Sequence, residues 1–191
     1  MKRLFDLFVV LVALILLSPI LIIAFFIIFI ADGFPVFYIQ QRVGLNGEMF
    51  NLYKFRSMKK NSDKLGSTTF KNDDRIFLGG RFLRKYKIDE LAQLLNVLKG
   101  EMSIVGPRPT VMEDFNKMTT AQEKRNIAVP GLTGLAQISG NTSLKWPERI
   151  KLDLEYIEKQ SFLFDLQIIF KTFLMVLSDR IDSETNDEGE W

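Results

Sequence analysis

The most prominent feature of the hydrophobic pattern is an apolar, uncharged run from Leu7 to Ala31. A run of this length predicts a helix that could cross a bilayer. A secretory signal peptide is disfavoured, because the run is too long and no small-residue cleavage site follows it. Ser18 and Pro19 lie in the middle of the run. Proline removes a backbone donor and clashes with the preceding turn, so a sharp kink is expected at this point.

The kink allows two arrangements in a membrane. Each arm would be roughly 18 Å long at the α-helical rise, which is short of the roughly 30 Å hydrocarbon core. A re-entrant hairpin that enters and leaves through one leaflet fits these lengths, with Ser18 able to satisfy a freed carbonyl. Positive flanks favour keeping both ends on the cytoplasmic side; they comprise Lys2, Arg3, Arg42, Lys54, Arg56, Lys59, Lys60 and Lys64. A kinked spanning helix is the alternative, and the pattern alone leaves both open.

The rest of the chain reads as short strands and helices. Alternating apolar residues around Asn46-Gly47 predict a β-hairpin within residues 34–58. The polar residues 59–74 predict a loop or a mobile lid. Helices are predicted over 80–86, 89–99, 111–126 and 147–159, with a turn and short strand over 130–140. The helix over 89–99 has its apolar stripe at Leu91, Leu94, Leu95 and Leu98 and its C-terminal cap at Gly100.

The last apolar stretch, residues 162–177, is interrupted by Asp165, Gln167 and Lys171. It is too charged to span a membrane and predicts an amphipathic helix. A core helix and a helix lying on the membrane interface both fit this pattern.

Composition narrows the chemistry. The 191 residues include no cysteine and no histidine, and 25 Lys or Arg against 23 Asp or Glu give a formal net charge of +2. Disulfides, zinc–thiolate sites, cysteine nucleophiles and Ser-His-Asp triads are therefore excluded. A metal would have to be a hard cation with oxygen ligands, which favours Mg²⁺. Residues 179–191 are strongly acidic, and the modestly basic remainder suits an anionic substrate or membrane surface rather than nucleic acid.

An acidic pair is the first candidate for chemistry. Asp89 and Glu90 stand where a helix is predicted to begin. They could simply stabilise the helix dipole, by about 0.3–1 kcal/mol each. Alternatively, one carboxylate is a nucleophile while the other handles a proton or holds a metal. Asp153 and Asp165 are weaker candidates, because acids on helix faces usually face solvent.

Basic residues are the second candidate. Arg108 lies between two prolines, which hold its backbone and suit bidentate phosphate recognition, although an ordinary surface turn would look the same. Arg84, within a basic cluster before the acidic pair, and Lys54, after the hairpin, could clamp phosphate or lie on a solvated face.

These motifs together resemble the bacterial sugar transferase family, the monotopic polyprenol-phosphate phosphoglycosyl transferases. The matching segments are residues 41–44, 53–58, 80–84, 89–109 and 129–137, and the resemblance extends from the membrane segment to about residue 177. Ala92, Glu101 and Leu135 depart from the commoner family residues, but no carboxylate or arginine of the motif is lost. The apolar run broken by Ser18-Pro19 also resembles the re-entrant helix of the family, which favours the hairpin arrangement.

The resemblance implies a fold and a division of the chain. The expected class is α+β and mostly helical, with a re-entrant membrane hairpin over residues 1–32. A cytosolic catalytic domain over 33–178 would contain a short β-hairpin and interfacial amphipathic helices. Residues 179–191 are expected to form a disordered acidic tail. The expected location is the cytoplasmic face of the bacterial inner membrane.

The resemblance also implies an activity: transfer of a phospho-sugar from a UDP-sugar to undecaprenyl phosphate, with release of UMP. Asp89 matches the nucleophile that forms an aspartyl phospho-sugar intermediate, and Glu90 its partner. Mg²⁺ would be held near Asp89. Arg84, Arg108 and Lys54 match phosphate-binding positions. The product would pass to other glycan-assembly enzymes. An aspartyl-phosphate phosphohydrolase and an inactive glycan-assembly subunit are the alternatives.

Overall fold

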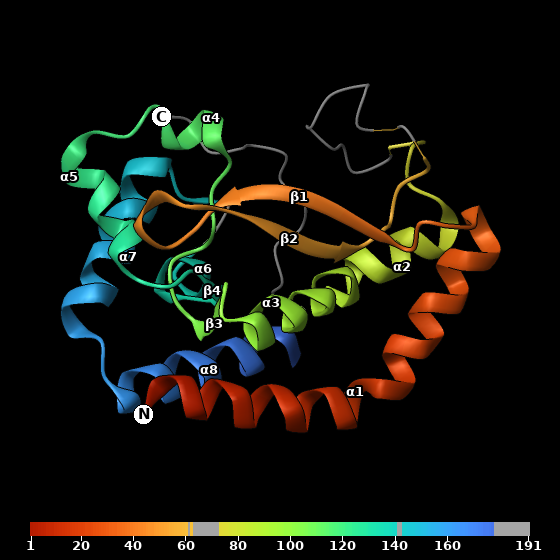
Figure 1. The fold of residues 1–191 in the computed structure, drawn as a ribbon, viewed down its shortest axis with the longest axis horizontal. Helices are drawn as coiled ribbons and strands as arrows, with labels where there is room; N and C mark the ends of the chain where they lie inside the picture. Colours follow the sequence, from red (N-terminus) through yellow and green to blue (C-terminus); the bar gives the residue numbers. More distant parts are fainter. Residues whose placement is uncertain (61, 63–72, 141–142, 178–191) are drawn as a thin grey trace.

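The computed structural model describes residues 1–60, 62, 73–140 and 143–177 (Figure 1). Most of the loop predicted over 59–74 and all of the acidic tail over 179–191 lie outside these residues. Within them the chain is mostly helical, with two small two-stranded sheets, as the α+β prediction required.

The apolar run forms one continuous helix, α1 (Lys2–Asp32), with Pro19 inside it. Figure 1 shows that α1 changes direction part-way along its length. Pro19 has no N–H for the carbonyl of Ile15, four residues earlier, and the Ser18 hydroxyl donates to that carbonyl oxygen at 2.8 Å. Among the described helices, α1 is the one long and apolar enough to cross a membrane.

The predicted hairpin is present. Strand β1 (Phe37–Val43) pairs antiparallel with β2 (Met49–Phe55), and Arg42 lies opposite Phe50. Asn46 and Gly47, in the short 3₁₀ turn η1 (Leu45–Gly47), both have positive φ values (54° and 81°), as the Asn-Gly signal predicts.

The described part of the segment after the hairpin packs on α1 (Figure 1). It contains α2 (Leu78–Lys85), the 3₁₀ helix η3 (Ile88–Gln93) and α3 (Leu94–Lys99). The single helix predicted over 89–99 is therefore two elements, although Gly100 does cap α3 with φ 89°. The predicted apolar stripe is also partly wrong: Leu94 is buried but Leu95 is 37% exposed, and Ala92 and Val97 are buried instead.

The next segment is less regular than predicted. Strand β3 (Ser103–Val105), which the sequence did not indicate, pairs parallel with the expected β4 (Gly131–Thr133). The helix predicted over 111–126 is wrong, because the chain forms three short turns: α4 (Met112–Phe115), α5 (Thr120–Glu123) and η4 (Lys124–Ile127). Three further helices follow: α6 (Leu135–Ile138), α7 (Trp146–Lys159) and α8 (Phe162–Leu177).

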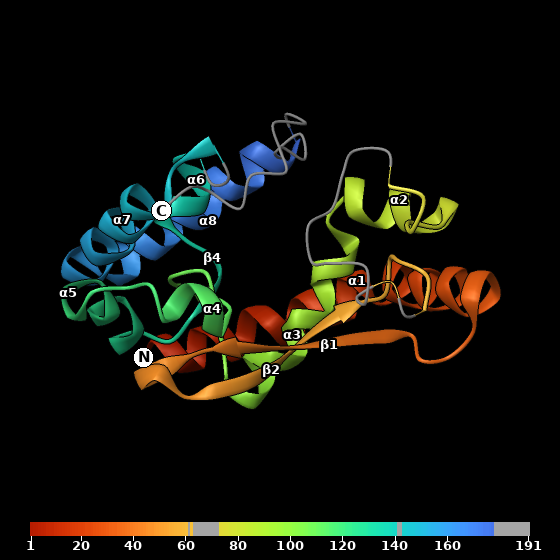
Figure 2. The same ribbon diagram turned by 90° about the horizontal axis from the view of Figure 1, so that it is seen from above.

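The two arms of α1 pack on two different hydrophobic clusters. Val10, in the first arm, belongs to a cluster with Leu94 of α3 and Ile168 of α8. Ala24 and Ile28, in the second arm, belong to another, which includes residues of β2, α2 and η3. In Figure 2, α1 passes beneath α3 and extends along most of the molecule. Its other faces carry large exposed apolar side chains, including Phe8, Leu11, Ile15, Leu16, Ile22, Ile23, Phe26 and Ile30.

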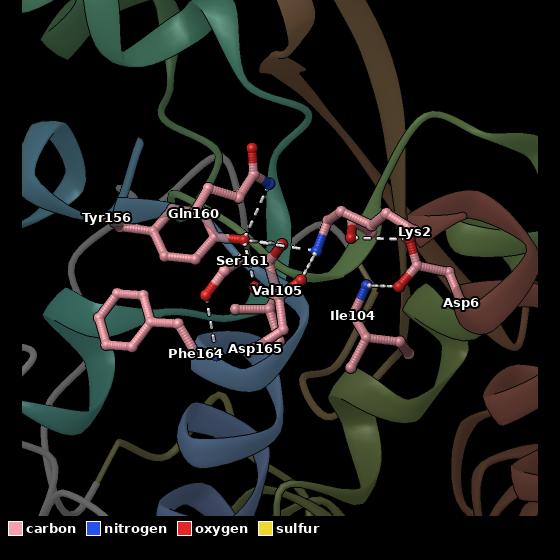
Figure 3. A network of polar contacts seen from close by, with 10 residues as sticks. Lys2, Asp6, Ile104, Val105, Tyr156, Gln160, Ser161, Phe164 and Asp165 are labelled. Atoms are coloured by element: carbon pink, nitrogen blue, oxygen red, sulfur yellow. Dashed lines mark hydrogen bonds and ion pairs between the residues drawn. The ribbon is translucent and has the colours of Figure 1, made fainter. Parts of the chain in front are cut away.

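Polar contacts fix both ends of α1 to the same domain, and Figure 3 shows those at its start. At the start, Lys2 Nζ lies 2.5 Å from Asp165 Oδ2, and buried Asp6 accepts from the Ser103 hydroxyl at 2.8 Å. At the end, Arg56 Nη2 donates to the carbonyls of Asp32 and Gly33 at 3.0 and 2.7 Å.

Asp165 and Asp153 were expected to face solvent, and that expectation is wrong. They are only 3% and 2% exposed. Asp165 is buried because it accepts hydrogen bonds from Lys2 and Tyr156, and Asp153 because it pairs with Arg125.

Candidate active site

Four charged side chains from three separate parts of the chain meet at the start of η3. Asp89 and Glu90 are in the first turn of η3, which follows Lys87, a residue with left-handed backbone (φ 55°). Lys54 comes from β2, against which η3 packs. Arg108 comes from the loop between β3 and α4. The structure therefore brings together residues that are up to 54 positions apart in the sequence, from Lys54 to Arg108.

Glu90 is at the centre of the ion pairs in this site. Its Oε1 atom lies 2.9 Å from Arg108 Nη2 and 3.4 Å from Lys54 Nζ. The Glu90 side chain is 20% exposed, so both interactions are partly shielded from water. The positive charges of Arg108 and Lys54 hold the pKa of Glu90 well below its usual range, although burial opposes them. Arg108 has the larger effect of the two. Glu90 is therefore ionised at neutral pH.

Asp89 is in a different environment, although it is the adjacent residue. Its Oδ1 atom is buried and has no hydrogen-bond partner. Burial, followed by the negative charge of Glu90, raises the pKa of Asp89 to about 6, while the charges of Lys54, Arg84 and Lys87 lower it. The two neighbouring carboxyls thus have different pKa values, because the cations lie around Glu90. Such a difference is typical of functional carboxyl pairs.

Lys54 also has a perturbed environment. Burial lowers its pKa, and the nearby charges of Arg108 and Arg42 add to this effect, whereas Glu90 opposes it. Cations thus gather around Glu90 in a partly dry site. These cations carry more positive charge than the Glu90 carboxylate neutralises, so the site favours an anionic ligand.

The loop that carries Arg108 is fixed along its backbone. Four successive carbonyls, from Pro107 to Thr110, each accept a hydrogen bond from a residue outside the loop. Their donors are Gly131 N at 2.8 Å, Arg125 Nη2 at 2.7 Å, Arg42 Nη1 at 3.5 Å and Val43 N at 2.8 Å. A Cβ on Gly131 would come within 2.0 Å of Gly106 N, so this close approach requires glycine. The rigidity predicted from the two prolines is therefore reinforced by tertiary contacts.

The donor set at Asp89 fits Mg²⁺. In the described part of the chain, no group of three or more Asp, Glu, His or Cys side chains converges. Mg²⁺ does not need one, because it commonly uses one or two carboxylates together with substrate phosphates and water. The unpartnered, buried Oδ1 of Asp89 is the atom suited to such a cation.

The residues predicted for the site are therefore close together. Asp89, Glu90, Lys54 and Arg108 are in one cluster, and Arg84 lies near enough for its charge to lower the pKa of Asp89. Ser18 and Pro19 lie in α1, apart from this cluster. Sequence reasoning missed Arg125, which supports the Arg108 loop from within the core. Its only signal was a basic residue inside a predicted helix, which normally indicates a solvated face.

The match to known proteins is extensive. Residues 1–179 fit the family model described as bacterial sugar transferase. The chain belongs to the bacterial sugar transferase family. This transferase is 41% identical over 186 residues to the uncharacterized sugar transferase EpsL of Bacillus subtilis (strain 168), covering 97% of this chain and 92% of EpsL. The exopolysaccharide production protein ExoY of Sinorhizobium fredii (strain NBRC 101917 / NGR234) is 39% identical over 195 residues. The match covers 94% of this chain and 86% of ExoY.

Longer proteins also contain a similar region. The UDP-glucose:undecaprenyl-phosphate glucose-1-phosphate transferase of Escherichia coli (strain K12) is 38% identical over 181 residues, which cover 90% of this chain and 39% of that protein. The family prediction made from the motifs is thereby confirmed, and the chain is an enzyme, a sugar transferase.

Proposed function

We propose that this sugar transferase moves a phospho-sugar from a UDP-sugar to undecaprenyl phosphate, giving undecaprenyl-diphosphate sugar and UMP. The observation that carries the proposal is the divided carboxyl pair: Glu90 is bound to Arg108 and Lys54, while Asp89 keeps a buried oxygen without a partner. Relatives whose names specify sugar-phosphate transfer to undecaprenyl phosphate support the substrate class.

In the first step, a carboxylate oxygen of Asp89 attacks the β-phosphorus of the UDP-sugar. The bond from this phosphorus to the bridging oxygen breaks, and UMP leaves with that oxygen. An aspartyl phospho-sugar remains on the enzyme. In the second step, a phosphate oxygen of the lipid attacks the same phosphorus and releases the Asp89 carboxylate. Burial of Asp89 disfavours its ionised carboxylate, and in the intermediate the negative charge lies on the phosphate oxygens instead.

Lys54, Arg108 and Arg84 neutralise the diphosphate. Phosphoryl transfer depends more on positioning and charge neutralisation than on proton transfer, so the absence of histidine is no obstacle. Glu90 is ionised and orients Arg108 and Lys54 through its ion pairs. Mg²⁺, when bound near Asp89, would supply further positive charge at the phosphates.

We also infer that α1 enters and leaves one leaflet, with the catalytic domain on the cytoplasmic face of the inner membrane. The contacts at the two ends of α1 support this topology, since Lys2 and Asp32 both bind the same domain. A straight helix crossing the membrane would place these ends on opposite sides. Exposed apolar residues of α8, including Phe170, Phe173 and Leu174, support a position at the interface, where the lipid phosphate lies.

The reaction is tested by measuring UMP release from a panel of UDP-sugars. Wild-type protein without lipid should release at most one UMP per enzyme, and added undecaprenyl phosphate should restore multiple turnovers. Asp89→Asn should release none. Sustained release without lipid would instead indicate a phosphohydrolase, and no release with any sugar would favour an inactive assembly subunit.

The topology is tested separately. Single cysteines at positions 2 and 40 should resist a membrane-impermeant reagent added outside intact cells, and both should react after the cells are opened. Labelling of position 2 alone from outside would show that α1 spans the bilayer.

A further inference from the structure

The backbone carbonyl of Arg108 is bound by a charged side chain from the protein interior. Arg125, in η4, is 1% exposed, and its Nη2 donates to Arg108 O at 2.7 Å. The other three carbonyls of the loop are bound by main-chain amides or by the half-buried Arg42. The contact from Arg125 is therefore the one that joins the loop to a buried ion pair.

Arg125 is itself held by Asp153 of α7. The Arg125 Nε and Nη2 atoms lie 2.8 and 2.6 Å from the same oxygen of Asp153, whose side chain is 2% exposed. The second oxygen of Asp153 is buried without a partner. A buried pair of this kind gains little stability, because removing both charges from water offsets their attraction. Packing stability alone therefore does not account for this pair.

We propose that Arg125, held by Asp153, is a positioning residue for Arg108. The guanidinium of Arg125 bridges α7 and the loop, and the loop in turn presents the Arg108 guanidinium to Glu90 at 2.9 Å. Neither Arg125 nor Asp153 touches the substrate. They fix where the Arg108 side chain begins, which matters because 42% of that side chain is exposed to solvent.

This inference rests on the proposed function, in which Arg108 binds phosphate. The geometric reason is that a shift of about 1 Å in a positioning group can reduce turnover by about 100-fold. An apolar pair of similar volume would keep the core filled but could not bind Arg108 O. Arg125→Met combined with Asp153→Leu makes this change without leaving one buried charge alone.

The double variant should melt within a few degrees of wild type. Its kcat should fall about 10- to 100-fold, while KM for the UDP-sugar should change less than about threefold, because Lys54 and Arg84 remain in place. When the same two substitutions are introduced into an Arg108→Ala variant, kcat should fall little further. A residue that acts through Arg108 has no side chain left to position in that variant. Independent, multiplicative losses would overturn the proposal.

A matched control removes the exposed ion pair of the same helix, in which Lys159 Nζ lies 2.7 Å from Glu155 Oε1. Glu155→Gln with Lys159→Gln should keep full activity. Hydrogen exchange gives a readout that does not depend on catalysis: the amides of Val43 and Gly131, which bind the loop carbonyls, should exchange faster in the double variant and not in the control.

The outcomes separate the two proposals. If wild type transfers no phospho-sugar, the proposed function fails, and the exchange rates still decide whether Arg125 holds the loop. If wild type is active and the double variant is equally active, or the loop amides exchange at wild-type rates, the positioning role is wrong and the proposed function stands.

Discussion

Replacing Asp89 with asparagine tests the electrostatics of the site through stability rather than activity. Folding raises the pKa of Asp89 from 3.8 to about 6, chiefly because the group is buried and secondly because Glu90 is adjacent. The folded protein therefore holds this proton more tightly than the unfolded chain does. Below about pH 4, Asp89 does not reduce the free energy of unfolding. Between about pH 4 and pH 6 its destabilising effect increases with pH, and above that range the effect is constant. Two units of pKa at 1.36 kcal/mol each give a full cost of about 3 kcal/mol.

Asparagine cannot ionise and avoids this cost. At pH 8, Asp89→Asn should therefore be more stable than wild type by up to about 3 kcal/mol. At roughly 2–4 °C per kcal/mol for a chain of this size, its melting temperature should rise by about 6–12 °C. Below about pH 4 the two proteins should melt together. The gain would accompany a complete loss of turnover, as expected where an active site stores unfavourable electrostatics.

The assay is thermal melting of purified protein in detergent, monitored by tryptophan fluorescence. Melting is measured across this pH range with a chelator present. Glu90→Gln is the matched control, because the cations around Glu90 lower its pKa and ionised Glu90 therefore stabilises the folded state. That variant should be less stable than wild type at pH 8. A destabilised Asp89→Asn protein, or a gain that does not change with pH, would refute the electrostatic argument.

Three further predictions concern other parts of the structure. Single-turnover UMP release should fall about tenfold per pH unit below about pH 6, because Asp89 must be ionised to attack; a rate that stays constant down to about pH 4.5 would contradict this. Gly131→Ala should reduce kcat and the melting temperature together, because the new Cβ would meet Gly106 N at 2.0 Å; wild-type behaviour would show that the loop adapts freely. Ser18→Ala should destabilise the kink by about 1 kcal/mol, seen as a lower melting temperature, whereas a Thr replacement that keeps the hydroxyl should not.

Local signals in the sequence predicted the elements that depend on local chemistry. Asn46-Gly47 indicated the hairpin and Pro147 the start of α7, because turn and cap preferences act over a few residues. Gly100 likewise marked the end of α3. The helix predicted over 111–126 failed because its residues bind β1, α7 and the 106–110 loop, and such tertiary contacts override helix propensity.

The site was predictable in its residue types but not in its geometry. Asp89 and Glu90 look equivalent in the sequence, and only the approach of Lys54 and Arg108 from elsewhere makes one carboxyl strongly acidic and leaves the other weakly so. The sequence did not indicate the role of Arg125, because that role depends on a partner 28 positions away on another helix. Long-range pairing of this kind leaves no periodicity in the chain.

The polar contacts at the start of α1 have a consequence for the order of folding. Lys2 binds Asp165, 163 positions later, and Asp6 binds Ser103, 97 positions later. During synthesis the first turns of α1 therefore exist long before their partners, and under the proposed topology the apolar run would associate with lipid while these contacts are still absent. The rest of the chain would then complete its core on a helix that is already in the membrane. Contacts of such long sequence separation form late, so assembly of this end of the molecule should be the slow step of folding.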